Sequence, residues 1–217
     1  DLLISFLLAG LTACGESKPG TQGFEDKNKL SVVTSIYPVY DFTRQIAGEN
    51  VELVNLVPAG MEPHDFELST GDMKLLEQAD VFIYNGAGME PFVEKTLQSI
   101  SNKDLVAVEA SQNVELLTKG HQTDPHTWLS IQNAKSECES IKNVLTESDP
   151  EHAGEYESNY SDYIKRLEEL SRKYEAELKD RKKNLIVVSH EAFGYLCREF
   201  GLEQQGIEGI SADAEPD

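Results

Sequence analysis

Residues 30–48, "LSVVTSIYPVYDFTRQIAG", carry the two local signals that decide the fold. The β-branched run that stops at Pro38 predicts a strand. The apolar side chains of the next stretch recur at helical spacing as far as Gly48, which predicts a helix ended by that glycine. A strand followed at once by a helix is the repeating unit of a parallel sheet.

The same unit recurs in the residues that follow, and each new strand is again an apolar run between polar or turn-forming residues. We expect strands at 51–58, 81–86 and 105–110, and helices at 69–80, 89–100 and 130–147. Residues 111–125 are polar and rich in turn formers, so we expect an irregular connection there. The alternation predicts an α/β fold with a parallel sheet and flanking helices.

Residues 150–183 differ from the rest of the chain. They are highly charged, contain neither Pro nor Gly after Gly154, and place their apolar and tyrosine side chains on one helical face. Pairs such as Glu168 and Arg172 stand four residues apart in the favourable order. We predict one helix of up to about 30 residues, on the order of 40 Å long at 1.5 Å per residue.

After this helix the strand–helix pattern restarts, with a buried strand at 184–190, a helix closed by Gly201 and a second strand from residue 205. Two strands and one helix cannot close a core, so we expect the second lobe to be incomplete in this chain. The predicted architecture is therefore two lobes of parallel sheet joined by the long helix. Its parts are an N-terminal lobe (30–148), the linking helix (149–183) and an incomplete C-terminal lobe (184–217).

The N-terminal segment predicts export. Residues 2–13 form an uncharged apolar run that is too short to span a bilayer but suits a signal peptide, so we assign residues 1–13 to a partial signal peptide with a clipped start. The run ends in "LTAC", which resembles a bacterial lipobox and makes Cys14 the expected lipidation site. Residues 14–29 are polar and suit a flexible tether. The alternative is a buried apolar segment that ends in an unrelated cysteine.

The composition restricts the partners. The chain has 39 acidic and 19 basic residues and a formal charge of −20. This balance argues against nucleic acid, which requires clustered Lys and Arg. It fits a soluble protein whose copies repel one another, so we expect a monomer. It also fits a protein that handles cations. Export permits a disulfide between Cys138 and Cys197, and the sequence leaves their pairing open.

Three of the five histidines stand where a sheet would gather them. His64 follows a strand, His126 lies in "DPHTW" just before a helix, and His190 ends a strand. Ligands of open parallel sheets bind outside the carboxyl ends of the strands. Neutral imidazole is a good ligand for zinc and for late first-row metals in general. The three histidines are therefore candidate metal ligands, although a packing or capping role is the alternative for each one.

Acidic residues flank these histidines and could accept a hydrogen bond from the ring nitrogen that faces away from a metal. The alternative is that they are surface charges. The candidates are Glu62, Asp65, Asp124 and Glu191. We expect His121, in a polar loop, and His152, at the start of the long helix, to cap or pack rather than to bind metal.

Three motifs resemble one protein family. Residues 56–90 ("LVPAGMEPHDFELSTGDMKLLEQADVFIYNGAGME"), 124–130 ("DPHTWLS") and 187–216, which begin "VVSHEAFGYL", are similar to the metal-binding lipoproteins of bacterial zinc and manganese ABC importers. The resemblance runs from about residue 30 to the end of the chain. It implies two α/β lobes joined by one rigid helix, with the metal between the lobes.

The resemblance also implies a ligand set and a function. It places metal ligands at His64, His126 and His190, and the family's fourth ligand, an acidic residue, would lie beyond Asp217. It implies an extracytoplasmic receptor, anchored to the bacterial cell membrane through Cys14, that delivers its ion to an ABC permease in the cytoplasmic membrane.

The residue at position 190 bears on the choice of metal. Manganese-type members resemble "SEGAF" at this place, whereas this chain has "SHEAF". A third imidazole instead of a hard carboxylate favours Zn²⁺ over Mn²⁺, so we expect zinc and keep manganese or iron as the alternative. The His-rich loop of many zinc-type members is replaced by a segment with His121 alone. We therefore do not expect a zinc-gathering loop.

An enzyme is the rival from another class. Three histidines and an open position also describe a hydrolytic zinc site, which would need a general base over the metal-bound water. Glu62 and Glu191 are candidates only because they are near in sequence, and the chain has no HExxH motif. We therefore do not expect an enzyme.

Overall fold

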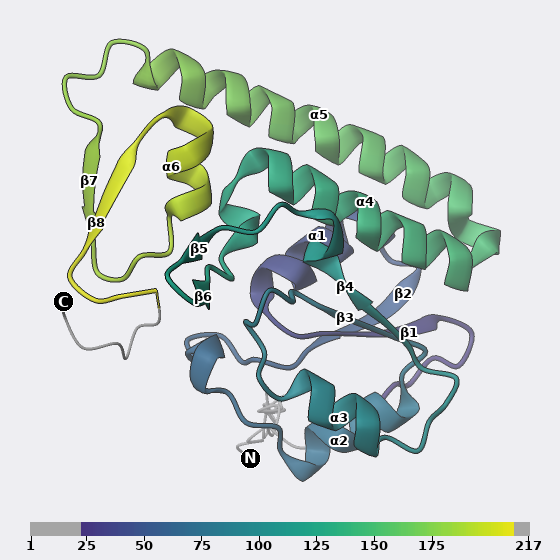
Figure 1. The fold of residues 1–217 in the computed structure, drawn as a ribbon. Coiled ribbons are helices and arrows are strands. Elements are labelled where there is room, and N and C mark those ends of the chain that lie inside the picture. The colour runs from purple at the N-terminus through teal and green to yellow at the C-terminus, as the bar shows by residue number, and fades with distance from the viewer. Residues whose placement is uncertain (1–22, 211–217) are drawn as a thin grey trace, which may run out of the picture.

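The structure, a computed structural model, describes residues 23–210. The expected signal peptide (1–13), Cys14 and the first part of the expected tether lie outside the described residues, as do residues 211–217 at the chain end. Figure 1 shows a larger N-terminal part built around a sheet and a smaller C-terminal part, with one long helix running along both.

The N-terminal part contains the predicted parallel sheet. Its four strands are β1 (Leu30–Thr34), β2 (Val51–Asn55), β3 (Val81–Tyr84) and β4 (Val106–Glu109). They pair in the order β2-β1-β3-β4, and every pairing is parallel. The central strands β1 and β3 are apolar and buried because helices cover both faces of the sheet. The predicted α/β fold is confirmed.

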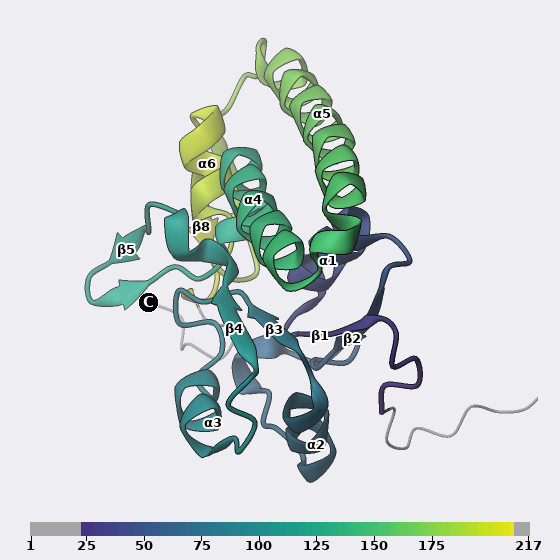
Figure 2. The same cartoon turned by 90° about the vertical axis from the view of Figure 1, so that its right-hand side faces the viewer.

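The helices lie where the apolar spacing predicted them. They are α1 (Tyr37–Ala47), α2 (Thr70–Gln78), α3 (Val93–Ser99) and α4 (Ile131–Ser148). Figure 2 shows α2 and α3 on one side of the sheet and α1 and α4 on the other. The predicted strand end at Pro38 was wrong, because β1 already ends at Thr34 and Pro38 lies in the first turn of α1, where a backbone N–H would have no partner within the helix. Ser69 caps α2 through a capping box with Asp72.

The connection expected to be irregular contains a small hairpin. After a 3₁₀ turn at Ala110–Asn113, β5 (Thr118–Lys119) and β6 (Gln122–Thr123) pair antiparallel. Gly120 turns the chain with a positive φ of 62°, which a glycine adopts at no steric cost. Strands this short leave no alternating pattern in the sequence, so the prediction missed them.

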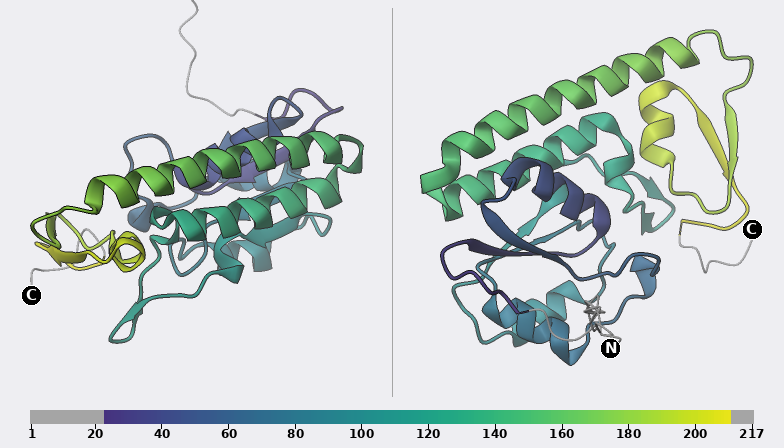
Figure 3. Two further views of the ribbon diagram at one scale, coloured as in Figure 1. Left: turned by 90° about the horizontal axis from the view of Figure 1, so that it is seen from above. Right: turned by 180° about the vertical axis from the view of Figure 1, so that it is seen from behind.

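The long helix is α5 (Ala153–Leu178), 26 residues, preceded by a 3₁₀ turn at Pro150–His152. It buries Tyr156, Tyr163 and Leu167, and it packs mainly against α4 and α1. Figure 3 shows α5 running beside α4 and beyond it to the C-terminal part. No helix within residues 23–210 is long and apolar enough to cross a membrane.

The C-terminal part consists of β7 (Leu185–Val188), α6 (Gly194–Phe200) and β8 (Glu203–Gly206), and its two strands are parallel. The second strand begins earlier than the predicted residue 205. The strand predicted at 184–190 is present as β7, but the prediction that it is buried was wrong, because Leu185 is 51% and Val187 69% exposed. The single helix α6 covers only one face of a two-stranded sheet.

The two cysteines described by the structure do not pair. Cys138 in α4 and Cys197 in α6 are both free and buried. Burial raises the pKa of both thiols, so both are protonated at neutral pH and act as small apolar side chains.

Glu137 is a carboxyl group inside the core. Its side chain is fully buried on α4, and within residues 23–210 neither carboxylate oxygen has a hydrogen-bond partner. Burial raises its pKa to about 8, the nearby side chain of Thr127 opposes this rise, and the charge of Glu90 adds to it. Between the ordinary glutamate value and about pH 8, the folded state therefore holds a proton that the unfolded state has lost. The free energy of unfolding must fall as the pH rises through this range.

We expect Glu137→Gln to remove this loss, because an amide cannot ionise. The variant should gain a few kcal/mol over the parent at about pH 9 and much less at about pH 5, measured by urea unfolding at both values. Glu139→Gln, on the exposed side of the same helix, is the control and should show no pH-dependent difference. An equal gain at both pH values would contradict the titration of Glu137.

Candidate metal centre

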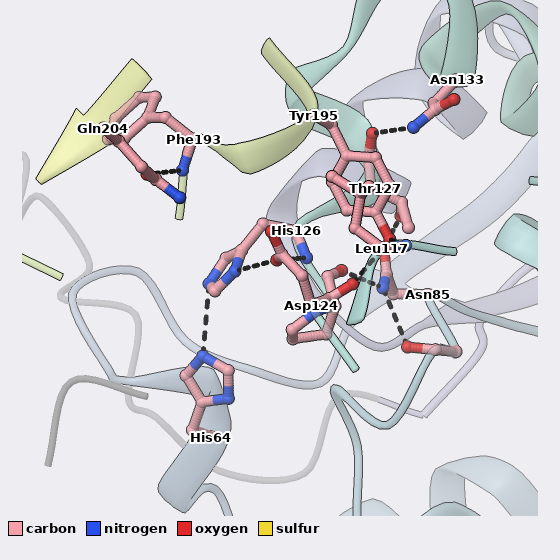
Figure 4. A network of polar contacts seen from close by, with 12 residues as sticks. His64, Asn85, Leu117, Asp124, His126, Thr127, Asn133, Phe193, Tyr195 and Gln204 are labelled. Atoms are coloured by element: carbon pink, nitrogen blue, oxygen red, sulfur yellow. Dashed lines mark hydrogen bonds and ion pairs between the residues drawn. The ribbon is translucent and has the colours of Figure 1, made fainter. Parts of the chain in front are cut away.

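His64 and His126 meet at the carboxyl edge of the sheet. His64 lies in a 3₁₀ turn (Pro63–Asp65) beyond β2, and His126 immediately precedes another (Thr127–Leu129) that leads into α4. Their Nε2 atoms are 3.3 Å apart, and Figure 4 shows the two rings pointing toward one another. His126 is only 4% exposed, whereas His64 is half-buried.

The spacing of this pair fits a metal. Zinc–nitrogen bonds are about 2.0–2.1 Å long, so two ligands at a tetrahedral angle stand about 3.3–3.4 Å apart. The observed 3.3 Å between the two Nε2 atoms is that separation. The same distance suits an N–H···N hydrogen bond between the rings, which would hold the pair together when no ion is bound.

His190 joins the pair from the C-terminal part. It lies just beyond β7, and its ring centre is 5.2 Å from that of His126, with the ring planes at 53°. Within residues 23–210, no three His, Cys, Asp or Glu side chains already stand in an arrangement that holds a metal ion. To serve as a third ligand, the imidazole of His190 would have to turn toward the pair.

Asp124 orients His126. Its Oδ1 accepts the backbone N–H of His126 (3.0 Å) and lies 2.8 Å from ring Nδ1. When Nδ1–H donates to this carboxylate, the lone pair of the neutral ring is on Nε2, which faces His64. Both Asp124 and His126 are buried, so this contact fixes the ring in a protected position.

The other flanking acids have different partners. Glu62 accepts the backbone N–H of His64 and so caps the 3₁₀ turn. Glu191 forms an ion pair of 2.8 Å with Lys119 on β5. Asp65 is exposed to solvent. Of the four candidates, Asp124 is the one whose carboxylate lies on an imidazole of the cluster.

The two remaining histidines, His152 and His121, lie in different parts of the structure. His152 stands at the start of α5, with Nδ1 2.7 Å from Asp149 Oδ2. His121 is exposed in the turn between β5 and β6. It lines, together with His64 and Pro125, a hollow of about 390 Å³ beside the cluster.

Asn85 is a functional candidate that the sequence did not reveal. It follows β3, is fully buried, and donates its side-chain amide to the carbonyl oxygen of Pro125 (2.9 Å), directly before His126. The Glu90 carboxylate accepts a hydrogen bond from the backbone N–H of Asn85 (2.8 Å) and so helps to fix its position. Burial raises the pKa of Glu90, and the hydrogen bonds it accepts oppose that rise. The sequence signal was "NG" after an apolar strand. It marks the end of the strand but does not indicate which group the Asn85 side chain binds.

Comparison with known proteins gives one consistent family. Residues 32–217 match the family described as zinc-uptake complex component A, periplasmic (ZnuA). The high-affinity zinc uptake system protein ZnuA of Bacillus subtilis is 36% identical over 228 residues, which cover 97% of this chain and 70% of that protein. The zinc-binding lipoprotein AdcA of Streptococcus pneumoniae is 34% identical over 230 residues, 99% of this chain and 45% of that protein.

A solved structure is similar over most of the chain. The crystal structure of the Zn(II)-bound ZnuA-like domain of Streptococcus pneumoniae AdcA superposes with a TM-score of 0.79 at 38% identity, over 87% of this chain and 70% of that one. The chain thus spans 70% of the Bacillus relative but less than half of the full pneumococcal protein.

We expect Asp124→Asn to weaken Zn²⁺ binding about tenfold or more, because a neutral amide is a poorer acceptor for the His126 ring. Competition with a chromogenic zinc chelator measures the affinity. Asp149→Asn is the matched control, since that carboxylate holds His152 in the same way at the start of α5. If the two variants bind zinc equally well, Asp124 has no special role at the cluster.

Proposed function

The chain belongs to the ZnuA family of zinc-uptake components, and from this premise we propose that it is an extracytoplasmic receptor that captures Zn²⁺ and delivers it to an ABC permease in the cytoplasmic membrane. The observation that carries the proposal is the His64–His126 pair, spaced at 3.3 Å, with His190 beside it. The zinc ion is the cargo rather than a resident cofactor.

The proposed ligands are His64, His126 and His190, with a carboxylate or a water in the fourth position. Three neutral imidazoles suit Zn²⁺ better than Mn²⁺, which prefers oxygen ligands. The zinc-bound structure of a relative supports the same metal. Protons compete with the ion for imidazole nitrogens, so acidification should weaken binding.

The proposed location is the outer face of the cytoplasmic membrane. Residues 1–13 would be a signal peptide, Cys14 the lipidated residue and 14–29 a tether. The family description as periplasmic and the name of pneumococcal AdcA as a lipoprotein support this location. The charge of −20 supports a receptor that stays monomeric.

The proposed division into lobes places the metal between them. His64 and His126 come from the N-terminal lobe (30–148) and His190 from the C-terminal lobe (184–217), with 149–183 as the link. The link supports both parts, because α5 packs along α4 and α1, and its Tyr174 stacks on Phe200 of α6 with ring centres 5.1 Å apart.

A zinc hydrolase is a poor alternative. The two acids that sequence proximity suggested as bases are engaged elsewhere, Glu62 on the backbone of His64 and Glu191 on Lys119. The family consists of transport receptors, not enzymes.

Isothermal titration of the metal-stripped protein with Zn²⁺ and Mn²⁺ tests the function. We expect one tight zinc site, weaker manganese binding, and a loss of zinc affinity of about 100-fold or more in His190→Ala, because one of three nitrogen ligands is removed. His152→Ala is the control and should bind like the parent. Tighter manganese than zinc binding would move the function to manganese uptake, and an unaffected His190→Ala would remove His190 from the site.

Small-angle X-ray scattering tests the rigid link. Because α5 packs against both parts, we expect the radius of gyration to change by less than about 1 Å when zinc binds. A hinge closing widely around the metal would produce a much larger decrease. That result would show that α5 does not restrain the lobes.

A further inference from the structure

Tyr195 connects the C-terminal part to the loop that carries His126. It lies on α6 and is fully buried. Its hydroxyl donates to the carbonyl oxygen of Asp124 (2.8 Å) and accepts the backbone N–H of Leu117 (3.0 Å). Figure 4 shows Tyr195, Leu117 and Asp124 in one network with His126.

These two bonds close the base of the β5–β6 hairpin. Leu117 and Asp124 flank the hairpin, and the backbone N–H of Asp124 donates to the carbonyl oxygen of Leu117 (2.9 Å). The phenol hydroxyl therefore completes a small cycle of hydrogen bonds that includes the backbone of Asp124. Because the side chain of Asp124 holds the His126 ring, the position of this backbone sets where Nε2 of His126 points.

α6 touches Asp124 at a second place. A Cβ atom added to Gly194 would stand 2.6 Å from Asp124 Oδ2, closer than two such atoms can approach, so the carboxylate lies directly against the backbone of Gly194. The Asp124 carboxylate cannot move away easily, since its Oδ1 is held by two nitrogens of His126. Neighbouring residues of α6 thus fix both the carbonyl group and the carboxylate of Asp124.

Other contacts between the same segments are more exposed. Lys119 pairs with Glu191, but its side chain is 57% exposed, and such pairs contribute little. Arg198 lies over the Tyr195 ring and reaches the carbonyl oxygen of Glu115 at 3.3 Å, near solvent. The buried phenol hydroxyl is the contact with the fixed geometry that a metal site needs.

We propose that Tyr195 is a positioning residue for metal binding, which holds Asp124 and through it His126 in the geometry that receives the ion. The inference rests on the proposed zinc-binding function and deepens it. The C-terminal part then serves the site twice, through His190 itself and through the hydrogen bonds from Tyr195 to Asp124.

Tyr195→Phe tests the proposal, because it removes only the hydroxyl. We expect zinc affinity about tenfold lower by chelator competition, at the low end of the effect of removing an outer hydrogen-bond partner of a ligand. The visible absorption of the Co²⁺-loaded protein, which reports ligand geometry, should change in band position or intensity. Tyr156→Phe is the matched control, since Tyr156 is also fully buried and donates to Asp149. It should lose stability without a change in either readout.

Gly194→Ala provides a second variant that acts on the Asp124 carboxylate directly. It should also lower zinc affinity and alter the Co²⁺ spectrum, whereas Gly154→Ala, where no atom lies within 4 Å of the added Cβ, should do neither. A Tyr195→Phe protein with parental affinity and parental Co²⁺ spectrum would overturn the proposal, as would equal effects of Tyr195→Phe and Tyr156→Phe. If the parent itself binds no zinc, the proposed function fails instead, and that result is distinct.

Discussion

The contact of 2.8 Å between the Asp124 carboxylate and Nδ1 of His126 decides which nitrogen of that ring can accept a metal. A histidine has two ring nitrogens, and only the one without a proton is a ligand. With Nδ1–H directed at Asp124, the lone pair of Nε2 lies toward His64. A ring free to rotate or to change tautomer would lower the affinity of the proposed site for its ion.

Because that contact is buried, the fold must supply hydrogen-bond partners for it. A carboxylate removed from water needs hydrogen-bond donors, and Asp124 obtains two from His126 itself. The loop around it is then held at its backbone: Asn85 binds the carbonyl oxygen of Pro125, and Tyr195 binds that of Asp124. One of these residues follows a strand of the parallel sheet and the other lies on α6. Residues from both parts of the chain therefore contact this loop, apart from His190.

Local pattern predicted much of the fold, and it failed where tertiary contacts decide. Apolar runs and helical spacing are properties of neighbouring residues, so the strands, the helices and the parallel sheet could be predicted. The hairpin at β5–β6 and the exposed face of β7 could not, since a two-residue strand has no period and burial depends on what packs against it. Pro38 suits both a strand end and a first helical turn, and its neighbours alone do not separate the two.

Prediction of the site from the sequence had the same limit. Histidines at strand ends, together with the family resemblance, suggested His64, His126 and His190, and the structure brings the three rings together. Among the flanking acids the sequence offered no ranking, because the choice depends on the turn at Asp124 and on a lysine 72 residues away that engages Glu191. Nothing in the sequence singled out Tyr195 on α6. Only the two hydrogen bonds of its hydroxyl point to the proposed positioning role.

A receptor must bind its ion tightly and still release it, and the described contacts suggest how one structure meets both needs. If α5 restrains the lobes as proposed, release of the ion would come from small shifts at the site. Because Tyr195 and Gly194 lie on α6 and His190 lies shortly before that helix, a displacement of α6 moves one proposed ligand and loosens the support of another together. The strength of a metal–nitrogen bond falls steeply with distance. A small movement would therefore be enough to detach two of the three proposed nitrogen ligands from the ion. A displacement of α6 would therefore act on the proposed site through both His190 and Asp124.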